Sequence, residues 1–350
     1  MVNGQSPISQ SPNLPISQFP YNLATMSSNI QFGWTLPPGL NKAKDYFIPN
    51  RYDEWADKWM EPGPQGHEPG QRWDAGIRRA LNLITGQWDS AWMTDHLQWG
   101  DDDCLEALTT LAFYAALTPA LNWGTMVLGQ GYRNPAMTAK MASTIQYLTQ
   151  GRLILGIGAG WKVDEYLAYG YNFPSPGQRI GELEEALHII KQMWNQPKAN
   201  YEGKYYKAID TINLPQTPKP PVLMIGGGGE QKMLPLIARH ADWWNTGAQG
   251  EVLQRKLGIL KEECAKNGRD FSTLRLTWFG GCTTANDDAT LQRRLRDDFV
   301  RNNGIWGNPQ QVTDKFKALV DAGVTYFMLD TRGLPEPGEL ESLIEISQKV

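Results

Sequence analysis

The stretch LNWGTMVLGQGYRNPAMTAKMASTIQYLTQGRLILG, residues 121–156, carries the pattern that decides the fold. It opens with an apolar run at 121–128, Asn134-Pro135 then marks a helix start, and Gly151 marks a helix end. Between these signals, side chains recur with the 3.6-residue period of a helix at Met137, Met141, Thr144 and Leu148. A second apolar run follows at 152–156. The stretch therefore predicts a strand–helix–strand unit, whose two strands are parallel.

The same alternation continues through most of the chain from residue 29 onward. Eight runs are expected to be strands: Ile30–Trp34, Ser90–Thr94, Leu121–Leu128, Arg152–Gly156, Pro221–Ile225, Asp242–Thr246, Leu274–Cys282 and Thr325–Asp330. Amphipathic helical patterns separate several of them, as in the segment from Ile180 to Trp194. Eight strand–helix repeats predict an α/β protein whose parallel sheet closes into a (β/α)₈ TIM barrel. An open, doubly wound sheet is the alternative.

Three segments interrupt or precede this alternation. Residues 1–28 are rich in Ser, Pro, Asn and Gln, so we expect a disordered leader, with Met26 as the possible true start. Residues 29–350 are expected to form one domain. The segment 40–72 contains Trp55 and Trp59 and would hang over the carboxyl-terminal face of a barrel, either as a lid or as a surface elaboration. The segment 199–219 predicts a hairpin followed by a Pro-rich linker.

Composition narrows the class of protein. The 350 residues carry 33 basic and 37 acidic side chains, a net charge of −4, which disfavours nucleic acid as a partner. No apolar run approaches the ~20 residues of a membrane helix, and the start lacks a signal-peptide pattern. Three widely spaced Cys and four His without HxxxH spacing predict neither a disulfide framework nor a metal site. We therefore expect a cytoplasmic protein without a metal or membrane partner.

Two glycine-rich segments follow predicted strands. The first, IGGGGE at 225–230, lies between a strand and a helical pattern, where backbone N–H groups and the helix start favour an anion such as phosphate. The second, LGIGAGW at 155–161, is GxGxG rather than the dinucleotide motif GxGxxG. A flexible turn, or a steric need for small residues, also explains such glycines. The ring of Trp161 either forms an aromatic wall of a ligand site or packs against other protein side chains.

Asp95 and His96 fall at the predicted carboxyl-terminal end of the second strand. A carboxylate beside an imidazole at a barrel mouth suits proton transfer. Because adjacent residues of an extended chain point to opposite faces, we expect only one of them to enter the pocket. Alternatively, Asp95 caps a helix and His96 is an ordinary polar residue. Asp101–Asp103 are expected to cap the following helix.

Several motifs occur in a specific order between residues 29 and 335. They are Met93-Thr94-Asp95-His96, Gly151-Arg152-Leu153, Gly158-Ala159-Gly160-Trp161, Glu165-Tyr166, Tyr169-Gly170, Phe173-Pro174-Ser175 with Arg179, Leu183-Glu184-Glu185-Ala186-Leu187, Gly203-Lys204-Tyr205-Tyr206, and the segment 225–230 followed by Ala241-Asp242. Together they resemble the bacterial-luciferase-like flavin and deazaflavin oxidoreductases. In detail the chain is most similar to the branch that depends on coenzyme F420.

The resemblance implies a barrel whose cofactor ring stacks inside the carboxyl-terminal mouth, with its phosphate against the glycine segments after the fourth and fifth strands. It implies a non-prolyl cis peptide under the ring, and the matching segment here is Gly124-Thr125-Met126. The cofactor-binding candidates are Thr125, Met126, Gly158, Gly160, Trp161, Gly226, Gly227, Gly228 and Gly229. Asp95 or His96 is then the catalytic candidate near the reacting edge. A small organic substrate and a homodimer are further implications.

The residues leave other functions open. One is a monooxygenase that uses FMN and dioxygen instead of hydride transfer to or from F420. In both cases the protein would position the cofactor and exclude water. A glycoside hydrolase barrel would need two carboxylates ~5–9.5 Å apart, for which Asp95, Glu165 and Asp330 are available, but it leaves both glycine segments unexplained. A non-catalytic barrel that binds the cofactor is also possible.

Overall fold

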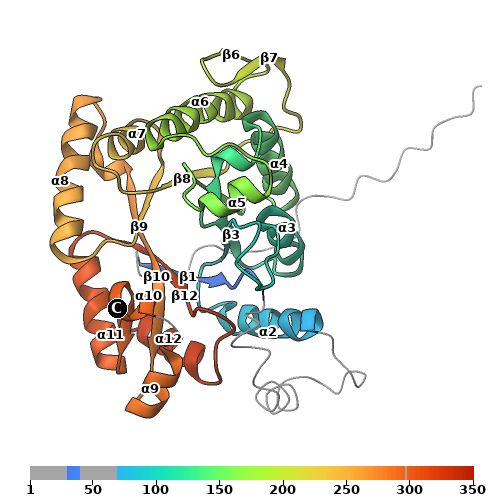
Figure 1. Ribbon diagram of the computed structural model, residues 1–350. Helices are drawn as coiled ribbons and strands as arrows, with labels where there is room; N and C mark the ends of the chain where they lie inside the picture. The colour runs from blue at the N-terminus through green and yellow to red at the C-terminus, as the bar shows by residue number, and fades with distance from the viewer. Residues whose placement is uncertain (1–29, 40–68, 296–297) are drawn as a thin grey trace, which may run out of the picture.

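A computed structural model describes residues 30–39, 69–295 and 298–350 of the chain (Figure 1). Its centre is a closed barrel of parallel strands, namely β1 (Gln31–Leu36), β2 (Ser90–Met93), β3 (Asn122–Thr125), β5 (Leu153–Gly158), β8 (Val222–Gly226), β9 (Trp243–Thr246), β10 (Arg275–Thr284) and β12 (Tyr326–Asp330). Each strand pairs with the next, and β12 returns to β1, which closes the barrel. The predicted (β/α)₈ barrel is confirmed, and the open doubly wound alternative is wrong.

All eight predicted strands are present, with boundaries shifted by one or two residues except at the third. The third expected strand, 121–128, is interrupted: β3 ends at Thr125, the peptide bond between Met126 and Val127 is cis, and β4 (Leu128–Gly129) pairs with β5. The predicted hairpin is formed by β6 (Ala199–Glu202) and β7 (Lys207–Thr211). The short strand β11 (Ile305–Gly307), which pairs with the long β10, has no counterpart in the prediction.

Helices surround the barrel, as Figure 1 shows. They are α2 (Pro69–Ile84), α3 (Ala107–Leu117), α4 (Pro135–Leu148), α5 (Val163–Ala168), α6 (Pro176–Asn195), α7 (Met233–His240), α8 (Gly250–Lys266), α9 (Asp288–Arg294), α10 (Asp298–Asn303), α11 (Pro309–Asp321) and α12 (Glu339–Ser347), with 3₁₀ turns η2 (Gln130–Tyr132) and η3 (Phe271–Thr273). The predicted helix starts are confirmed, because Asn134 and Ser175 accept hydrogen bonds from the first turns of α4 and α6. The expected cap at Asp101–Asp103 is wrong: Glu106 caps α3 through the N–H groups of Leu108 and Thr109.

Packed side chains fill the inside of the barrel. A cluster within it consists of Trp92, Met126, Ile154, Met224, Tyr326 and Met328. A larger cluster between strands and helices contains the fully buried Trp34, Trp123, Trp244 and Trp278. These tryptophans therefore serve the core, as bulk packing predicts for most of them. Because the barrel is filled, a ligand has to bind above it, at the mouth where the strands end.

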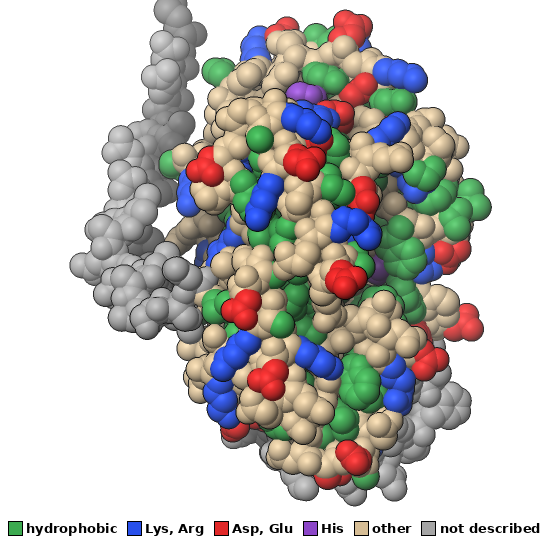
Figure 2. Space-filling model, turned by 90° about the vertical axis from the view of Figure 1, so that its left-hand side faces the viewer, with side chains coloured by type: hydrophobic (Ala, Val, Ile, Leu, Met, Phe, Trp, Pro, Cys, Tyr) green, Lys and Arg blue, Asp and Glu red, His purple; other side chains and the backbone are tan. Residues whose placement is uncertain are grey.

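Two predicted segments cannot be compared with the structure. The leader 1–28, with the possible start at Met26, and most of the insertion 40–72 lie outside the described residues, and α2 begins at Pro69. Among the described helices, none has the length and apolar character needed to cross a membrane. On the face of the molecule seen in Figure 2, basic and acidic side chains are interspersed.

Candidate active site

The candidate residues meet where the parallel strands end. Asp95 and His96 follow β2, the segment 158–161 lies at the end of β5, and the segment 226–229 lies at the end of β8. β5 and β8 are paired neighbours, with Ile157 opposite Ile225, so the two glycine segments lie side by side. The barrel thereby places residues separated by more than 130 positions around one mouth.

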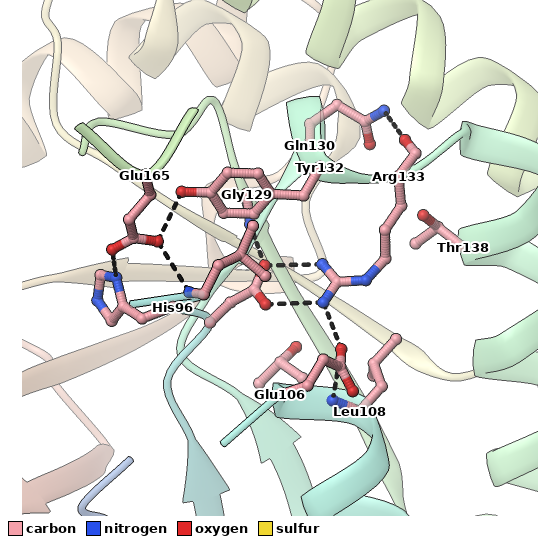
Figure 3. Close-up of polar contacts among 12 residues, drawn as sticks. His96, Glu106, Leu108, Gly129, Gln130, Tyr132, Arg133, Thr138 and Glu165 are labelled. Carbon is pink, nitrogen blue, oxygen red and sulfur yellow. Dashed lines mark hydrogen bonds and ion pairs between the residues drawn. The ribbon is translucent and has the colours of Figure 1, made fainter. Parts of the chain in front are cut away.

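His96 is fixed by a buried carboxylate. Its Nδ1 lies 2.7 Å from Oε1 of Glu165, a residue of α5 whose side chain is fully buried (Figure 3). The other oxygen of Glu165 accepts hydrogen bonds from the Leu97 N–H at 3.0 Å and from the Tyr132 hydroxyl at 2.9 Å. Burial and this contact with the carboxylate raise the pKa of Tyr132, which therefore stays a donor. The carboxylate in turn orients the imidazole and selects its tautomer.

Aromatic rings surround the imidazole. The ring of Trp99 meets His96 edge to face at 4.7 Å between centroids, and the ring of Trp161 does so at 5.8 Å. The Lys162 amine lies 5.2 Å from the centre of the Trp99 ring and 3.6 Å from Oε1 of Glu165. Trp161 is 66% exposed, so it lines the mouth rather than the core. Together these rings form an apolar rim beside the imidazole.

Asp95 points away from His96 into an ion-pair network. Its two oxygens accept hydrogen bonds from both terminal nitrogens of Arg133 at 2.8 Å, and one of them also accepts from the Gly129 N–H at 2.8 Å (Figure 3). Arg133 also donates to Glu106 at 2.5 Å. Burial opposes the guanidinium charge, but the two carboxylates outweigh it and raise the pKa of Arg133. The carboxylate of Asp95 is thus engaged as an anchor, and it does not cap a helix.

The glycine segments form a cradle, and at two of its glycines the neighbouring side chains leave no room for a β-carbon. Gly160 has φ +74°, and a Cβ there would collide with the Tyr166 hydroxyl. Gly227 has φ +144°, and its Cβ would lie 2.9 Å from Cγ of Met233. Within the described residues, the N–H groups of Gly228 and Gly229 donate to no backbone carbonyl. These open donors fit an anionic group, as the sequence predicts.

Lys256 of α8 adds a cation to this cradle. Its amine donates to the Gly228 carbonyl and lies 3.7 Å from Oε1 of Glu230. A Cβ on Gly228 would lie 3.1 Å from the same amine. The start of α7 at Met233 follows a three-residue turn, so the helix does not begin directly after the glycines. The cation and the free N–H groups together supply the charge that a phosphate requires.

The floor of the mouth is formed by the end of β3. The hydroxyl of Thr125 donates to the Gly156 carbonyl at 2.7 Å and accepts from the Gly156 N–H at 2.9 Å, so it joins β3 to β5. Met126 is 7% exposed and packs on the inside of the barrel. The cis bond lies between Met126 and Val127, just after the residues expected from the resemblance. A Cβ on Gly226 would lie 2.9 Å from Val127, which explains that glycine sterically.

The structure therefore brings the predicted residues to one mouth but divides their tasks. His96 and Trp161 face it, the glycines shape it, and Thr125 and Asp95 have their polar atoms occupied by other protein groups. Sequence reasoning missed Arg133 and Lys256, and it placed Glu165 only in a motif and in the hydrolase alternative. A lone Arg or Lys on a helix or turn carries no signal of its own, because only the folded chain shows which carboxylate or carbonyl it meets.

A family model described as luciferase-like monooxygenase matches residues 60–297 of the chain. The chain belongs to this family. An F420-dependent glucose-6-phosphate dehydrogenase of Kineococcus radiotolerans is 39% identical over 283 residues, which cover 70% of this chain and 83% of that protein. An F420-dependent hydroxymycolic acid dehydrogenase of Mycobacterium tuberculosis is 30% identical over 188 residues, 52% of this chain and 51% of that one.

Solved structures of other proteins share the fold. An F420-dependent secondary alcohol dehydrogenase in complex with an F420–acetone adduct superposes with a TM-score of 0.73 at 16% identity, covering 91% of this chain and 98% of that chain. EDTA monooxygenase from Chelativorans sp. BNC1 gives 0.70 at 15% identity, with coverage of 91% and 93%. The predicted family is confirmed, and with it the oxidoreductase class at the level of the family. The glycoside hydrolase alternative is accordingly wrong.

Proposed function

We propose that this chain is an F420-dependent oxidoreductase that transfers a hydride between the deazaflavin and an alcohol or carbonyl substrate. The observation that carries the proposal is the imidazole of His96, held 2.7 Å from the buried carboxylate of Glu165 beside the glycine cradle. The names of the dehydrogenase relatives support both the cofactor and an alcohol-type substrate.

The cradle fits the phosphate of such a cofactor. The N–H groups of Gly228 and Gly229 and the Lys256 amine would hold it, since they combine open donors with a positive charge. Gly158, Gly160, Gly226 and Gly227 would allow the cofactor chain to approach the backbone, while Trp161, Thr125 and Met126 would border the ring. When bound, F420 supplies the carbon centre that accepts or releases the hydride.

His96 would move the proton that accompanies the hydride. With Glu165 accepting the Nδ1–H, the Nε2 lone pair of His96 is the basic position, and no hydrogen bond to Nε2 is present within the described residues. In alcohol oxidation, Nε2 of His96 would accept the hydroxyl proton, while F420 held by the glycine cradle would supply the hydride acceptor, so that a carbonyl product remains. The rings of Trp99 and Trp161 border this imidazole. Asp95 acts as a positioning residue, because its carboxylate is bound by Arg133.

The direct test is a fluorescence titration of the purified protein with F420 and with FMN, each oxidised and reduced. We expect selective binding of F420, followed by reduction of bound F420 when an alcohol substrate is supplied. Selective binding of FMN would overturn the proposal in favour of a dioxygen-dependent monooxygenase. Binding of F420 without turnover of any alcohol or carbonyl would indicate a non-catalytic barrel. Binding of neither would contradict the cradle itself.

We also propose a homodimer and a cytoplasmic location. Exposed apolar side chains occur on two helices, with Phe113 and Leu117 on α3 and Met137, Tyr147 and Leu148 on α4. An apolar area of this kind suits a second copy of the chain. All three cysteines are free, which suits a reducing compartment. Sedimentation should give twice the chain mass, and Phe113→Glu should shift it towards the monomer; a monomeric wild type would contradict the dimer.

A further inference from the structure

We propose a divalent transition-metal site, with Zn²⁺ as its fitting ion, formed by Glu184, His188 and His240 on the outer helical layer of the barrel. The one-oxygen, two-nitrogen donor set is assembled from two helices that lie side by side in Figure 1, α6 and α7. It is separate from the mouth: His240 is the last residue of α7, only a short link before β9 begins, so it lies towards the end of the barrel opposite the active site.

The geometry of the donors is close to what a single ion requires. Glu184 and His188 are four residues apart on α6 and so share one face of that helix. One ligand atom from each of the three side chains lies within 4.8 Å of the others. The two imidazoles meet edge to face with ring centres 4.9 Å apart, and Nε2 of His240 is 3.5 Å from Oε1 of Glu184. Binding of one ion at about 2.0–2.2 Å from each donor would require the three side chains to rotate towards one another.

The environment of the imidazoles also favours a ligand. His240 is 9% exposed, and His188 has ring contacts with His240 and Tyr201 but no hydrogen bond or ion pair within the described residues. The Tyr201 ring stacks on His188 at 12° and so limits the orientations of that imidazole. The two imidazoles supply nitrogen lone pairs and the carboxylate supplies a negative charge, and all three groups lie close together.

The donor chemistry selects the class of ion. Two imidazoles and one carboxylate, completed by water, form a common tetrahedral set for Zn²⁺, and the same set binds Co²⁺. Hard ions such as Mg²⁺ prefer all-oxygen sites. Arg239 competes for the Glu184 oxygen that faces His240: it donates to Oε1 at 2.6 Å, so a metal bound there would displace this guanidinium. A bound ion would join α6 to α7 and stabilise the folded chain by mass action.

The test uses the full-length protein after treatment with a chelator. Co²⁺ should bind at one ion per chain and give a visible absorbance band typical of tetrahedral coordination. Zn²⁺ should displace the Co²⁺, which removes the band, and should raise the Tm. His188→Ala, at an exposed position that does not endanger the fold, should weaken Co²⁺ binding at least tenfold, as should His240→Ala. Arg239→Gln should tighten it, because the competing guanidinium is removed. Glu182→Gln, on the same helix, is the matched control and should bind as the wild type does.

Three outcomes would overturn the site. They are the absence of a Co²⁺ band in the wild type, a band that persists in the His188→Ala/His240→Ala double variant, and an equal loss in Glu182→Gln. The double variant also measures background binding by cysteines elsewhere in the chain. Because the readout is metal absorbance and Tm, it does not depend on cofactor or substrate, and its failure is distinct from failure of the proposed function.

Discussion

The two sides of the barrel mouth are built on opposite principles. On the side of β2 and α5, charged groups are closely paired: Glu165 accepts from three partners and Asp95 from two. On the side of β8, glycines carry no side chain, and the N–H groups of Gly228 and Gly229 have no acceptor in the part of the chain that the structure describes. The first side is rigid because its polar groups are satisfied by protein. The second is receptive because its polar groups are not.

The side of β2 and α5 is suited to position a side chain, and the side of β8 is suited to bind a ligand. A proton-transfer group has to be held in one orientation, and His96 obtains this from a carboxylate that is itself fixed by Tyr132 and the Leu97 N–H. A cradle for an anion needs donors with no internal acceptor, which glycines supply without steric cost. Substitutions on the two sides should therefore affect different measurable quantities.

The largest effect is expected for His96→Ala. Turnover should fall by about 10²–10⁴-fold, the usual contribution of a general acid–base group, while the Kd for F420 stays close to wild type. The Tm should fall as well, because the buried carboxylate of Glu165 loses one of its three hydrogen-bond donors. Stopped-flow measurement of F420 reduction alongside a fluorescence titration would separate the two quantities. Unchanged turnover would show that His96 takes no part in the chemistry and that the β2 and α5 side of the mouth is not the catalytic side.

Arg133→Met should have the largest effect on stability. It leaves the buried carboxylate of Asp95 without its bidentate partner, for which we expect a loss of about 3–5 kcal/mol in the free energy of unfolding. The matched control is Arg78→Met, which breaks an exposed pair with Asp74 and should cost only about 0.3–0.5 kcal/mol. Denaturant unfolding measures both. Equal losses would show that the charged side is no more rigid than the surface.

Gly228→Asp should act on binding alone. The new carboxylate would occupy the cradle and pair with Lys256, so affinity for F420 should fall by about 10²-fold, from repulsion of about 4 kcal/mol between charges ~4 Å apart that is partly screened. Gly258→Ala lies on the same helix as Lys256, has nothing within 4 Å of its Cβ, and should bind F420 normally. Isothermal titration distinguishes the two variants, and unchanged affinity in Gly228→Asp would refute the cradle.

The smallest effect concerns Cys104, close to the charged side. Burial, with the nearby carboxylates of Glu165 and Asp95, raises the pKa of this thiol to about 12, so only about 10⁻⁴ of it is thiolate at pH 8. Burial also raises the pKa of Cys264 and of Cys282. A disulfide reagent at pH 8 should label the native protein very slowly and all three thiols after unfolding. Rapid native labelling of Cys104 would show that the charged side opens readily.

Much of the fold could be predicted from the sequence because its signals are local. Asn134 and Ser175 cap helices at the predicted places, and the eight apolar runs are strands, since capping and side-chain period depend on neighbouring residues only. The same reasoning failed at α3, where three consecutive aspartates look like a cap, but Glu106 supplies it. Several acidic residues near the start of this helix satisfy the preference for a negative charge at a helix N-terminus, and the path of the loop decides which of them becomes the cap.

By itself, the sequence determined the barrel and the positions of the glycine segments through side-chain period and spacing, and it indicated the family through the resemblance of its ordered motifs. Only the tertiary structure decided which of two adjacent residues serves the mouth: Asp95 turns to Arg133, and His96 turns to Glu165. It likewise brought His240 beside Glu184 and His188, where the spacing of histidines alone predicted no metal site. Such partners come from distant strands and helices, so their meeting depends on how the closed sheet and its helices pack, which no local pattern records.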